Sequence, residues 1–300
     1  MNAKVRQQLD ARQRRSQRRL DKTKFPSKPG PVLAGGNRRY EMADRVHGLS
    51  YGGIALFHRL AHDVGLVKAI DTRLPIFTIR LPYTESDHVL NIAFNALCNG
   101  DCLQDLELRR NDVNYLDALG AQRVPDPTTA GDFCRRFTVA HLHLLQDLYD
   151  AARRGVWRHQ PARFVDEAVL DADGTLVPTT GQCKQGMDIA YNGVWGYHPL
   201  VVSLANTRAV LRLVNRPGNR PSHEGAAEAL DLAIATCLRG GFRRVRLRGD
   251  TDFSQTAPLG RWDADGRITF VFGYDSKPDL EERAEQVPER AWQPLQRPAR

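Results

Sequence analysis

Two acidic blocks, each directly after a short apolar stretch, place the strongest constraint on how this chain can fold. The first, residues 170–175, reads LDADGT and follows Ala168 and Val169; the second, residues 248–253, reads RGDTDF and follows Val245 and Leu247. In open α/β sheets, the carboxyl ends of the strands line the crevice in which ligands bind. Paired carboxylates suit Mg²⁺, which prefers oxygen ligands and retains some of its waters. The two blocks therefore predict a divalent-cation site at one edge of a sheet.

The composition is that of a soluble globular protein with a basic character. Of the 300 residues, 41% are hydrophobic and 26% are charged, and this length allows one large or two medium domains. No apolar run approaches the roughly 20 residues that span a bilayer, and the basic N-terminus lacks the apolar stretch of a secretory signal. Five scattered cysteines indicate reduced thiols. We therefore expect a cytoplasmic protein without a membrane partner, and its net charge of +8 favours a polyanionic one.

Basic residues concentrate at the N-terminus. Residues 1–24 contain nine lysines or arginines and two aspartates, which accounts for nearly all of the net charge. Such an arm can neutralise DNA phosphates without reading sequence; a solvated, disordered tail is the alternative, and the sequence leaves both open. Pro26, Pro29 and Pro31 predict a linker before any regular structure, so residues 1–31 are interpreted as a basic arm and linker. The candidate DNA contacts of the arm are Arg14, Arg15, Arg18 and Arg19.

Residues 32–160 are interpreted as a helical DNA-binding region. Apolar residues recur at helical spacing between residues 54 and 70 and again between residues 142 and 148. Ser86 is the expected N-cap of an apolar helix that ends at Leu97, and a second helix is expected near residues 102–110. Two helices joined by a glycine-containing turn are compatible with a DNA-reading helix-turn-helix and also with an ordinary helical hairpin.

From residue 161 the hydrophobic period changes to that of strands. Strands are expected at residues 164–173, 196–206, 208–214, 242–247 and 268–272. A helix capped by Ser222 is expected at residues 223–238, and a short one at residues 256–262. The resulting order, β-β-β-α-β-α-β, predicts a mixed α+β or α/β domain with a ribonuclease H-like sheet at residues 161–275. Residues 276–300 contain no predicted helix or strand that would complete this domain, and they are interpreted as the start of an insertion or a truncated tail.

Four sequence blocks occur in an informative order within this region. They are LDADGT at residues 170–175, YNGVWGYHPL at residues 191–200, RPGN at residues 216–219 and RGDTDF at residues 248–253. Together with residues 105–112 and 119–129 of the helical region, they resemble the DDE transposases of bacterial insertion sequences. These are the cut-and-paste transposases with a ribonuclease H-like catalytic domain. The resemblance covers most of residues 45–275.

The resemblance implies a site in which two aspartates and a glutamate hold two Mg²⁺ or Mn²⁺ ions for in-line phosphoryl transfer. It points to Asp173 and Asp250 as the catalytic, metal-binding aspartates. Asp171 shares the strand face of Asp173 and is the fallback ligand, and Asp252 is a weaker one. Both can instead be structural, either by capping a turn or by pairing with an arginine such as Arg246 or Arg248. The resemblance also implies double-stranded DNA as partner, a homodimer in a synaptic complex, and association with the nucleoid.

The expected glutamate is the main departure from the family. In the family it comes from a helix well after the second aspartate, and Glu281, Glu282, Glu285 and Glu289 fall where an insertion would begin. We therefore expect a C-terminally truncated transposase with weak activity alone. One alternative is a catalytically dead DNA-binding protein. Another is a haloacid-dehalogenase-like phosphatase with Asp171 as nucleophile and Asp173 as acid/base, although residue 254, where that family usually has a further aspartate, is Ser254.

Polar residues between the third strand and its helix form a further candidate DNA contact, because arginines at a helix N-terminus suit phosphate. An exposed basic loop without a ligand is the alternative. The residues of this cluster are Arg212, Arg216, Asn219, Arg220 and His223. Three aromatic residues, Tyr191, Trp195 and Tyr197, can either stack on a base or pack on a sheet.

Overall fold

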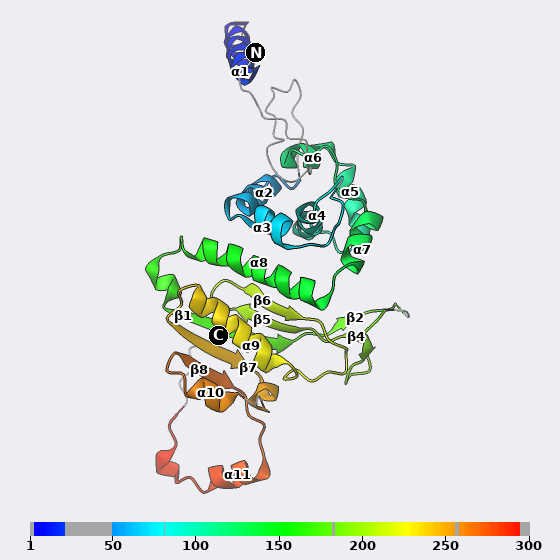
Figure 1. The fold of residues 1–300 in the computed structure, drawn as a ribbon. Helices are drawn as coiled ribbons and strands as arrows, with labels where there is room; N and C mark the ends of the chain where they lie inside the picture. Colours follow the sequence, from blue (N-terminus) through cyan, green and yellow to red (C-terminus); the bar gives the residue numbers. More distant parts are fainter. Residues whose placement is uncertain (1–2, 22–49, 81, 182–183, 256–257, 295–300) are drawn as a thin grey trace. The chain divides into compact units, whose positions relative to one another are not determined.

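The computed structural model describes residues 3–21, 50–80, 82–181, 184–255 and 258–294. The chain divides into two compact units, Met1–His159 and Gln160–Arg300 (Figure 1). Among the described residues, no helix is both long and apolar enough to cross a membrane.

Helices make up the first unit. It begins with α1 (Ala3–Asp21), a regular helix where only an arm and linker were expected. The expectation that no regular structure precedes the linker was wrong, because residues 3–21 lack glycine and proline and are rich in Ala, Arg, Gln and Leu, which favour helix. The linker residues 22–31, and residues 32–49 after them, lie outside the described part. The later helices are α2 (Ile54–Asp63), α3 (Leu66–Arg73), α4 (Glu85–Leu97), η1 (Leu103–Asp105), α5 (Leu106–Arg110), α6 (Val113–Leu119), α7 (Pro127–Arg135) and α8 (Val139–Trp157).

Helix α4 contributes to two apolar clusters among the described residues of the first unit. Leu90 and Phe94 belong to a cluster that also contains the buried Tyr115. Val89, on another side of the helix, belongs to a second cluster with Phe133. One helix that is apolar on several sides therefore links the two parts of this core.

The N-cap of α4 is Thr84 rather than the expected Ser86. Thr84 forms a capping box with Asp87, whose carboxylate accepts a hydrogen bond from the Thr84 main-chain N–H at 2.9 Å. Ser86 lies inside the helix, and its N–H and hydroxyl both donate to Asp71 of α3 at 3.0 Å. The Ser86 hydroxyl thus ties α4 to α3 instead of capping the helix.

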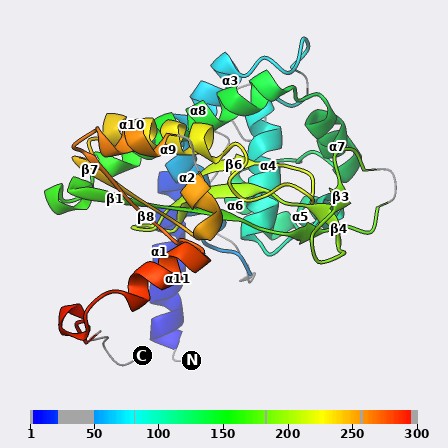
Figure 2. The same cartoon turned by 90° about the horizontal axis from the view of Figure 1, so that it is seen from below.

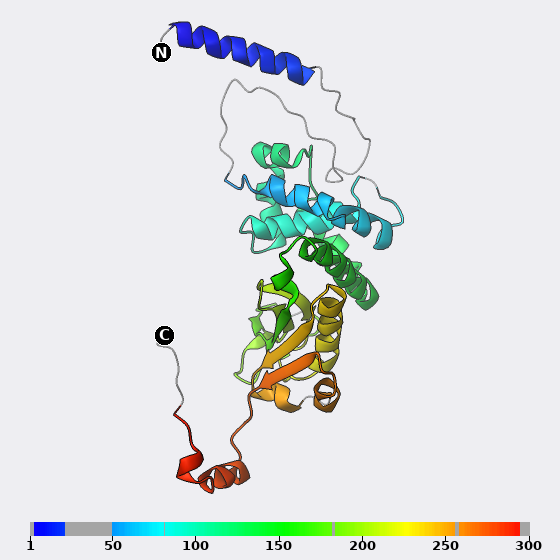
Figure 3. The ribbon, with the colours of Figure 1, turned by 90° about the vertical axis from the view of Figure 1, so that its left-hand side faces the viewer.

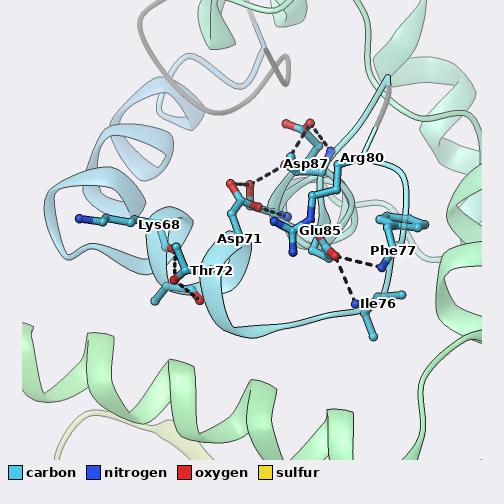
Figure 4. A network of polar contacts seen from close by, with 11 residues as sticks. Lys68, Asp71, Thr72, Ile76, Phe77, Arg80, Glu85 and Asp87 are labelled. Carbon is cyan, nitrogen blue, oxygen red and sulfur yellow. Dashed lines mark hydrogen bonds and ion pairs between the residues drawn. The ribbon is translucent and has the colours of Figure 1, made fainter.

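Glu85, the first residue of α4, is fully buried and anchors the segment that precedes the helix (Figure 4). Its carboxylate accepts hydrogen bonds from the main-chain N–H groups of Ile76 at 3.2 Å and Phe77 at 3.0 Å. Arg80 pairs with the same carboxylate at 3.0 Å. A buried carboxylate is stable here because main-chain donors and a guanidinium replace the water that it loses.

The second unit is built on a five-stranded mixed sheet with the order β6-β5-β1-β7-β8. Strand β1 pairs antiparallel with β5 and parallel with β7, and β7 and β8 run side by side in the same direction (Figure 3). Helix α9 (Ala226–Arg239) packs on one face of the sheet, against β1, β5, β6 and β7 (Figure 2). The predicted mixed, ribonuclease H-like fold class is confirmed. The strands are β1 (Glu167–Gly174), β5 (Leu200–Leu204), β6 (Ala209–Val214), β7 (Arg244–Gly249) and β8 (Ile268–Phe272).

A second, three-stranded sheet was not predicted. It has the order β2-β4-β3 and consists of β2 (Val177–Pro178), β3 (Asp188–Ile189) and β4 (Trp195–Tyr197). The single strand expected at residues 196–206 is therefore divided into β4 and β5. The division falls at His198 and Pro199, because proline has no N–H to donate to a ladder.

The helices of the second unit also differ from expectation at their ends. Helix α9 begins at Ala226, after Gly225 in the left-handed conformation with φ of 72°, and not at His223. Residues 221–225 instead form turns in which Glu224 N–H donates to the Pro221 carbonyl. The remaining helices are η2 (Ala162–Val165), η3 (Thr251–Gln255), α10 (Leu259–Asp263), α11 (Pro278–Glu285) and η4 (Glu289–Ala291). Helix α11 has no buried residue among those described.

Candidate active site

Asp173 and Asp250 lie level with each other at the ends of two adjacent parallel strands. Each paired residue of β1 faces the residue of β7 that is 77 positions later, up to the pair formed by Asp171 and Arg248. The same offset places Asp173 beside Asp250, which directly follows the last residue of β7. Both side chains are exposed to solvent. The two carboxylates therefore share one corner of the sheet.

The electrostatics of Asp250 show that these carboxylates interact. The pKa of Asp250 is raised, first by partial removal of the carboxylate from water and further by the charges of Asp252 and Asp173. A neighbouring negative charge disfavours ionisation of the Asp250 carboxyl group. A divalent cation would relieve this repulsion, and carboxylate oxygens are the ligands that Mg²⁺ and Mn²⁺ prefer. The residues at this corner therefore fit two of the ligands that such a cation needs.

Asp171, the fallback ligand, is engaged elsewhere. Arg248 on β7 binds both of its carboxylate oxygens, with Nε to Oδ1 at 2.6 Å and Nη2 to Oδ2 at 2.8 Å. This two-point geometry places two N–H donors of the guanidinium opposite the two carboxylate oxygens, edge to edge. Of the two alternatives for Asp171, the ion pair with Arg248 is the one observed, so Asp171 is not a free metal ligand in this structure.

Asp252 holds the loop that carries Asp250. Its carboxylate accepts a hydrogen bond from the main-chain N–H of Ser222 at 3.1 Å. The main-chain N–H of Asp252 in turn donates to Oδ1 of Asp250 at 3.1 Å. Asp252 thus connects the Asp250 side chain to the turns that precede α9, and it acts as a positioning residue.

No third protein ligand joins the pair within the described part of the chain. There, no group of three or more His, Cys, Asp or Glu side chains is arranged to hold a metal ion. This finding covers the glutamates on and after α11 that were considered for the third ligand, which are Glu281, Glu282, Glu285 and Glu289. The described site is accordingly a carboxylate pair.

Two of the predicted DNA contacts are corrected by the structure. Arg212 is 3% exposed, and its guanidinium donates to the carbonyl of Leu211 at 2.7 Å and to the hydroxyl of Thr236 on α9 at 2.9 Å. Arg216 is 7% exposed and donates to main-chain carbonyls. Both guanidinium groups are used inside the protein, so neither is available to a phosphate.

Arg216 clamps the turns beside the carboxylate pair. Its Nε donates to the carbonyl of His198 at 3.0 Å, while Nη1 donates to the carbonyls of Pro221, Ser222 and Glu224 at 3.0, 3.2 and 2.6 Å. Burial lowers the pKa of Arg216, and the negative charge of Glu224 partly offsets that effect. The charge is accommodated because four carbonyl dipoles point at it.

The remaining candidates for DNA contact are more accessible. Asn219 and Arg220 are exposed, and Arg220 pairs with Glu224 at 3.2 Å, whereas His223 is half-buried. In α1, Arg14, Arg15 and Arg18 are exposed; the side chain of Arg19 lies outside the described part. These residues stay predictions as DNA contacts.

Close packing around Gly174, the residue after Asp173, was not predicted. A Cβ atom at Gly174 would lie 2.5 Å from His198 Nε2 and 2.9 Å from Ser222 Oγ. The His198 ring is fixed from its other side, where Nδ1 donates to the carbonyl of Arg220 at 2.6 Å. The sequence signals were the glycine after Asp173 and the histidine before Pro199. Neither indicates that Gly174 and His198 lie in contact.

The strand order and directions define the class of the second unit as ribonuclease H-like. A family model described as "Transposase DDE domain group 1" matches residues 46–299. The chain therefore belongs to this family of DDE transposases, as the sequence blocks had predicted.

A search of curated protein sequences gave no significant match. Among solved structures, the chain is similar to a piggyBac transposase synaptic complex with hairpin DNA, determined by cryo-EM, with 13% sequence identity and a TM-score of 0.37. The alignment covers 80% of this chain and 53% of that one, so the chain spans about half the length of the solved transposase.

Proposed function

We propose that this protein binds transposon-end DNA and takes part in metal-dependent strand cleavage and strand transfer. The observation that carries this proposal is the level placement of Asp173 and Asp250 at neighbouring strand ends, with interacting charges. Membership of the DDE transposase family supports the same chemistry.

In the proposed site, Asp173 and Asp250 hold Mg²⁺ or Mn²⁺ between their carboxylates. When bound, the cation supplies charge stabilisation for the phosphoryl group and lowers the pKa of a coordinated water or hydroxyl. Asp252 keeps the Asp250 side chain in place, and Arg248 withdraws Asp171 from the metal. Two ions, as implied for the family, would need ligands beyond this carboxylate pair.

Double-stranded DNA is the proposed partner, bound by a homodimer that brings two transposon ends together. The accessible cationic residues of α1 and of the Asn219–Arg220 turn are proposed to contact phosphates, which gives affinity that falls as salt rises. Nucleoid association would follow from the same contacts.

The phosphatase alternative is disfavoured by the site. A nucleophilic Asp171 needs a free carboxylate oxygen, and both of its oxygens accept hydrogen bonds from Arg248. The alternative of a DNA-binding protein without catalysis has one supporting observation, which is that no third carboxylate joins the pair among the described residues.

Metal binding by three matched variants tests the proposed site. Mn²⁺ affinity is measured by calorimetry for Asp173→Asn, Asp250→Asn and the control Asp171→Asn, which makes the same change on the same face of β1. We expect Asp173→Asn and Asp250→Asn to bind at least about tenfold more weakly, since losing even an outer partner of a ligand costs about 10–100-fold. Asp171→Asn should bind like the wild type. Equal affinity in all three variants would contradict the proposed site.

Cleavage of transposon-end DNA in Mg²⁺ or Mn²⁺ separates the two transposase roles. Metal-dependent nicking that disappears in Asp173→Asn and Asp250→Asn, but not in Asp171→Asn, supports catalysis by this chain. Salt-sensitive DNA binding without nicking in any variant supports the binding-only role. Hydrolysis of small phosphate esters that Asp171→Asn abolishes would favour the phosphatase instead.

A further inference from the structure

The strand that carries Asp173 continues beyond it as part of a long antiparallel ribbon. Strands β1 and β5 pair Gly174 with Leu200, and β2 and β4 pair Val177 with Tyr197, so the register is the same on both sides of the interruption. Between these pairs, Thr175 N–H donates to the Pro199 carbonyl at 3.0 Å. No residue is inserted on either strand, and the small sheet is a direct extension of the main one (Figure 1).

This continuity determines which side chains share a face with Asp173. Alternate residues of a strand lie on one face, and directly opposed residues lie on the same face. Val177 is four residues after Asp173 and therefore shares its face, as does its partner Tyr197. Trp195, two residues before Tyr197, lies there too and pairs with Ile189 of β3.

These four residues, Val177, Ile189, Trp195 and Tyr197, form what we term the aromatic platform. Val177 is 44% exposed, Ile189 46% and Trp195 52%, whereas Tyr197 is half-buried. The Tyr197 hydroxyl donates to the Gln185 carbonyl at 2.8 Å, which fixes its ring. The platform is thus a pre-formed apolar surface on the same face of the ribbon as the proposed metal ligand.

We propose that the aromatic platform binds an unpaired DNA strand by stacking its bases, an inference that rests on the proposed function. Every base has a π-face, so stacking on aromatic rings accepts any sequence. At about 3.3 Å per residue, the platform lies about 13–20 Å from Asp173 along the ribbon. That distance is about 4–6 nucleotides of a stacked strand at 3.4 Å each. A strand cleaved at Asp173 can therefore reach it.

The edge of the platform has the groups that a DNA backbone needs. A cleft of about 470 Å³ beside Trp195 is lined by Pro178, Thr179, Thr180, Lys184 and Val194. Lys184 Nζ lies 2.5 Å from the Thr179 hydroxyl, so a cation and a hydroxyl stand next to the exposed ring. An ammonium beside an aromatic surface favours a polyanion with π-faces over an apolar protein segment.

Binding of two DNA molecules by the 300-residue chain tests this proposal. One is a blunt duplex; the other is the same duplex with a single-stranded extension of about six nucleotides that carries 2-aminopurine. The variants are Trp195→Ala, Trp195→Phe, and the control Trp292→Ala, which removes another exposed tryptophan, 59% exposed, from the C-terminal segment. Affinity is measured by fluorescence anisotropy and stacking by quenching of 2-aminopurine.

We expect Trp195→Ala to weaken binding of the extended DNA about 5- to 150-fold, the range for loss of one base–aromatic stack, and to abolish the quenching. Trp195→Phe should retain most of the affinity, and Trp292→Ala should resemble the wild type. All variants should bind the blunt duplex alike. Equal loss on both DNAs, an unchanged affinity of Trp195→Ala, or a change only in oligomeric state would overturn the platform. Absence of DNA binding by the wild type would instead overturn the proposed function itself.

Discussion

Replacing Arg216 by methionine removes the clamp beside the carboxylate pair while keeping a side chain of similar length. Four main-chain carbonyls lose a charged donor. Pro221 and Glu224 are exposed, so water can replace the guanidinium at their carbonyls, whereas Ser222 is buried and His198 is half-buried. A buried acceptor left without a partner costs about 1–3 kcal/mol. Counting only His198 and Ser222, we expect Arg216→Met to lower the free energy of unfolding by about 2–6 kcal/mol.

Urea denaturation of the second unit, followed by circular dichroism, measures this loss. The matched control is Arg220→Met, which removes a neighbouring arginine whose side chain is about half exposed and pairs with Glu224. Exposed ion pairs of this kind contribute about 0–1 kcal/mol. Hydrogen exchange gives a local readout, since the amides of residues 216–226 should exchange faster in Arg216→Met only. The reasoning is refuted if both variants unfold at the same urea concentration and exchange alike.

The same perturbation should reach the proposed metal site. Arg216 holds the Ser222 carbonyl, and the Ser222 N–H donates to Asp252, which positions Asp250. Arg216→Met should therefore weaken Mn²⁺ binding as well as stability, whereas Arg220→Met should leave Mn²⁺ affinity unchanged.

Three further outcomes are expected. The pKa of Asp250 is raised in the folded protein, so its protonated form stabilises the fold at low pH. This stabilisation is lost as the pH rises through that pKa. Asp250→Asn should accordingly raise Tm at neutral pH by up to about 3 °C, with no gain at low pH or in Mn²⁺. Gly174→Ala should cost about 1–3 kcal/mol by overpacking against His198, and a second change, His198→Ala, should restore part of it in thermal melts. Replacing Arg14, Arg15 and Arg18 of α1 by glutamine should reduce the slope of log affinity against log salt by up to about 3, while an unchanged slope would exclude these three arginines from DNA contact.

The sequence was sufficient to predict the strands that carry the carboxylates because buried strands leave a strong local signal. An apolar run that ends in an acidic block identified β1 and β7, and the strand expected at residues 268–272 has the observed bounds of β8. The small sheet was missed because its strands are two or three residues long, too short for an alternating pattern. A segment as short as Trp195–Tyr197 does not reveal with which distant strand it pairs.

Arg212 and Arg216 were misassigned for a different reason. A charged residue in a polar segment is usually exposed, so an arginine near a helix N-terminus is interpreted as a phosphate contact. The acceptors that stabilise Arg216 are main-chain carbonyls at positions 198, 221, 222 and 224. Every residue has such a carbonyl, so side-chain identity cannot indicate which ones converge on a buried guanidinium. Only the turn geometry, which the sequence did not specify, brings them together.

The placement of Asp250 explains why so much positioning structure surrounds the pair. Asp173 is held by the ladder of β1, but Asp250 lies just past the end of β7 and faces two other carboxylates. Without a cation, repulsion would move it away unless its loop were fixed. Two contacts fix this loop. The Asp252 carboxylate accepts a hydrogen bond from the Ser222 N–H. The buried Phe253 packs closely on Gly249, where an added Cβ atom would lie 2.7 Å from the Phe253 ring. The loop therefore holds the two charges together before a metal binds, which lowers the reorganisation needed to form the site.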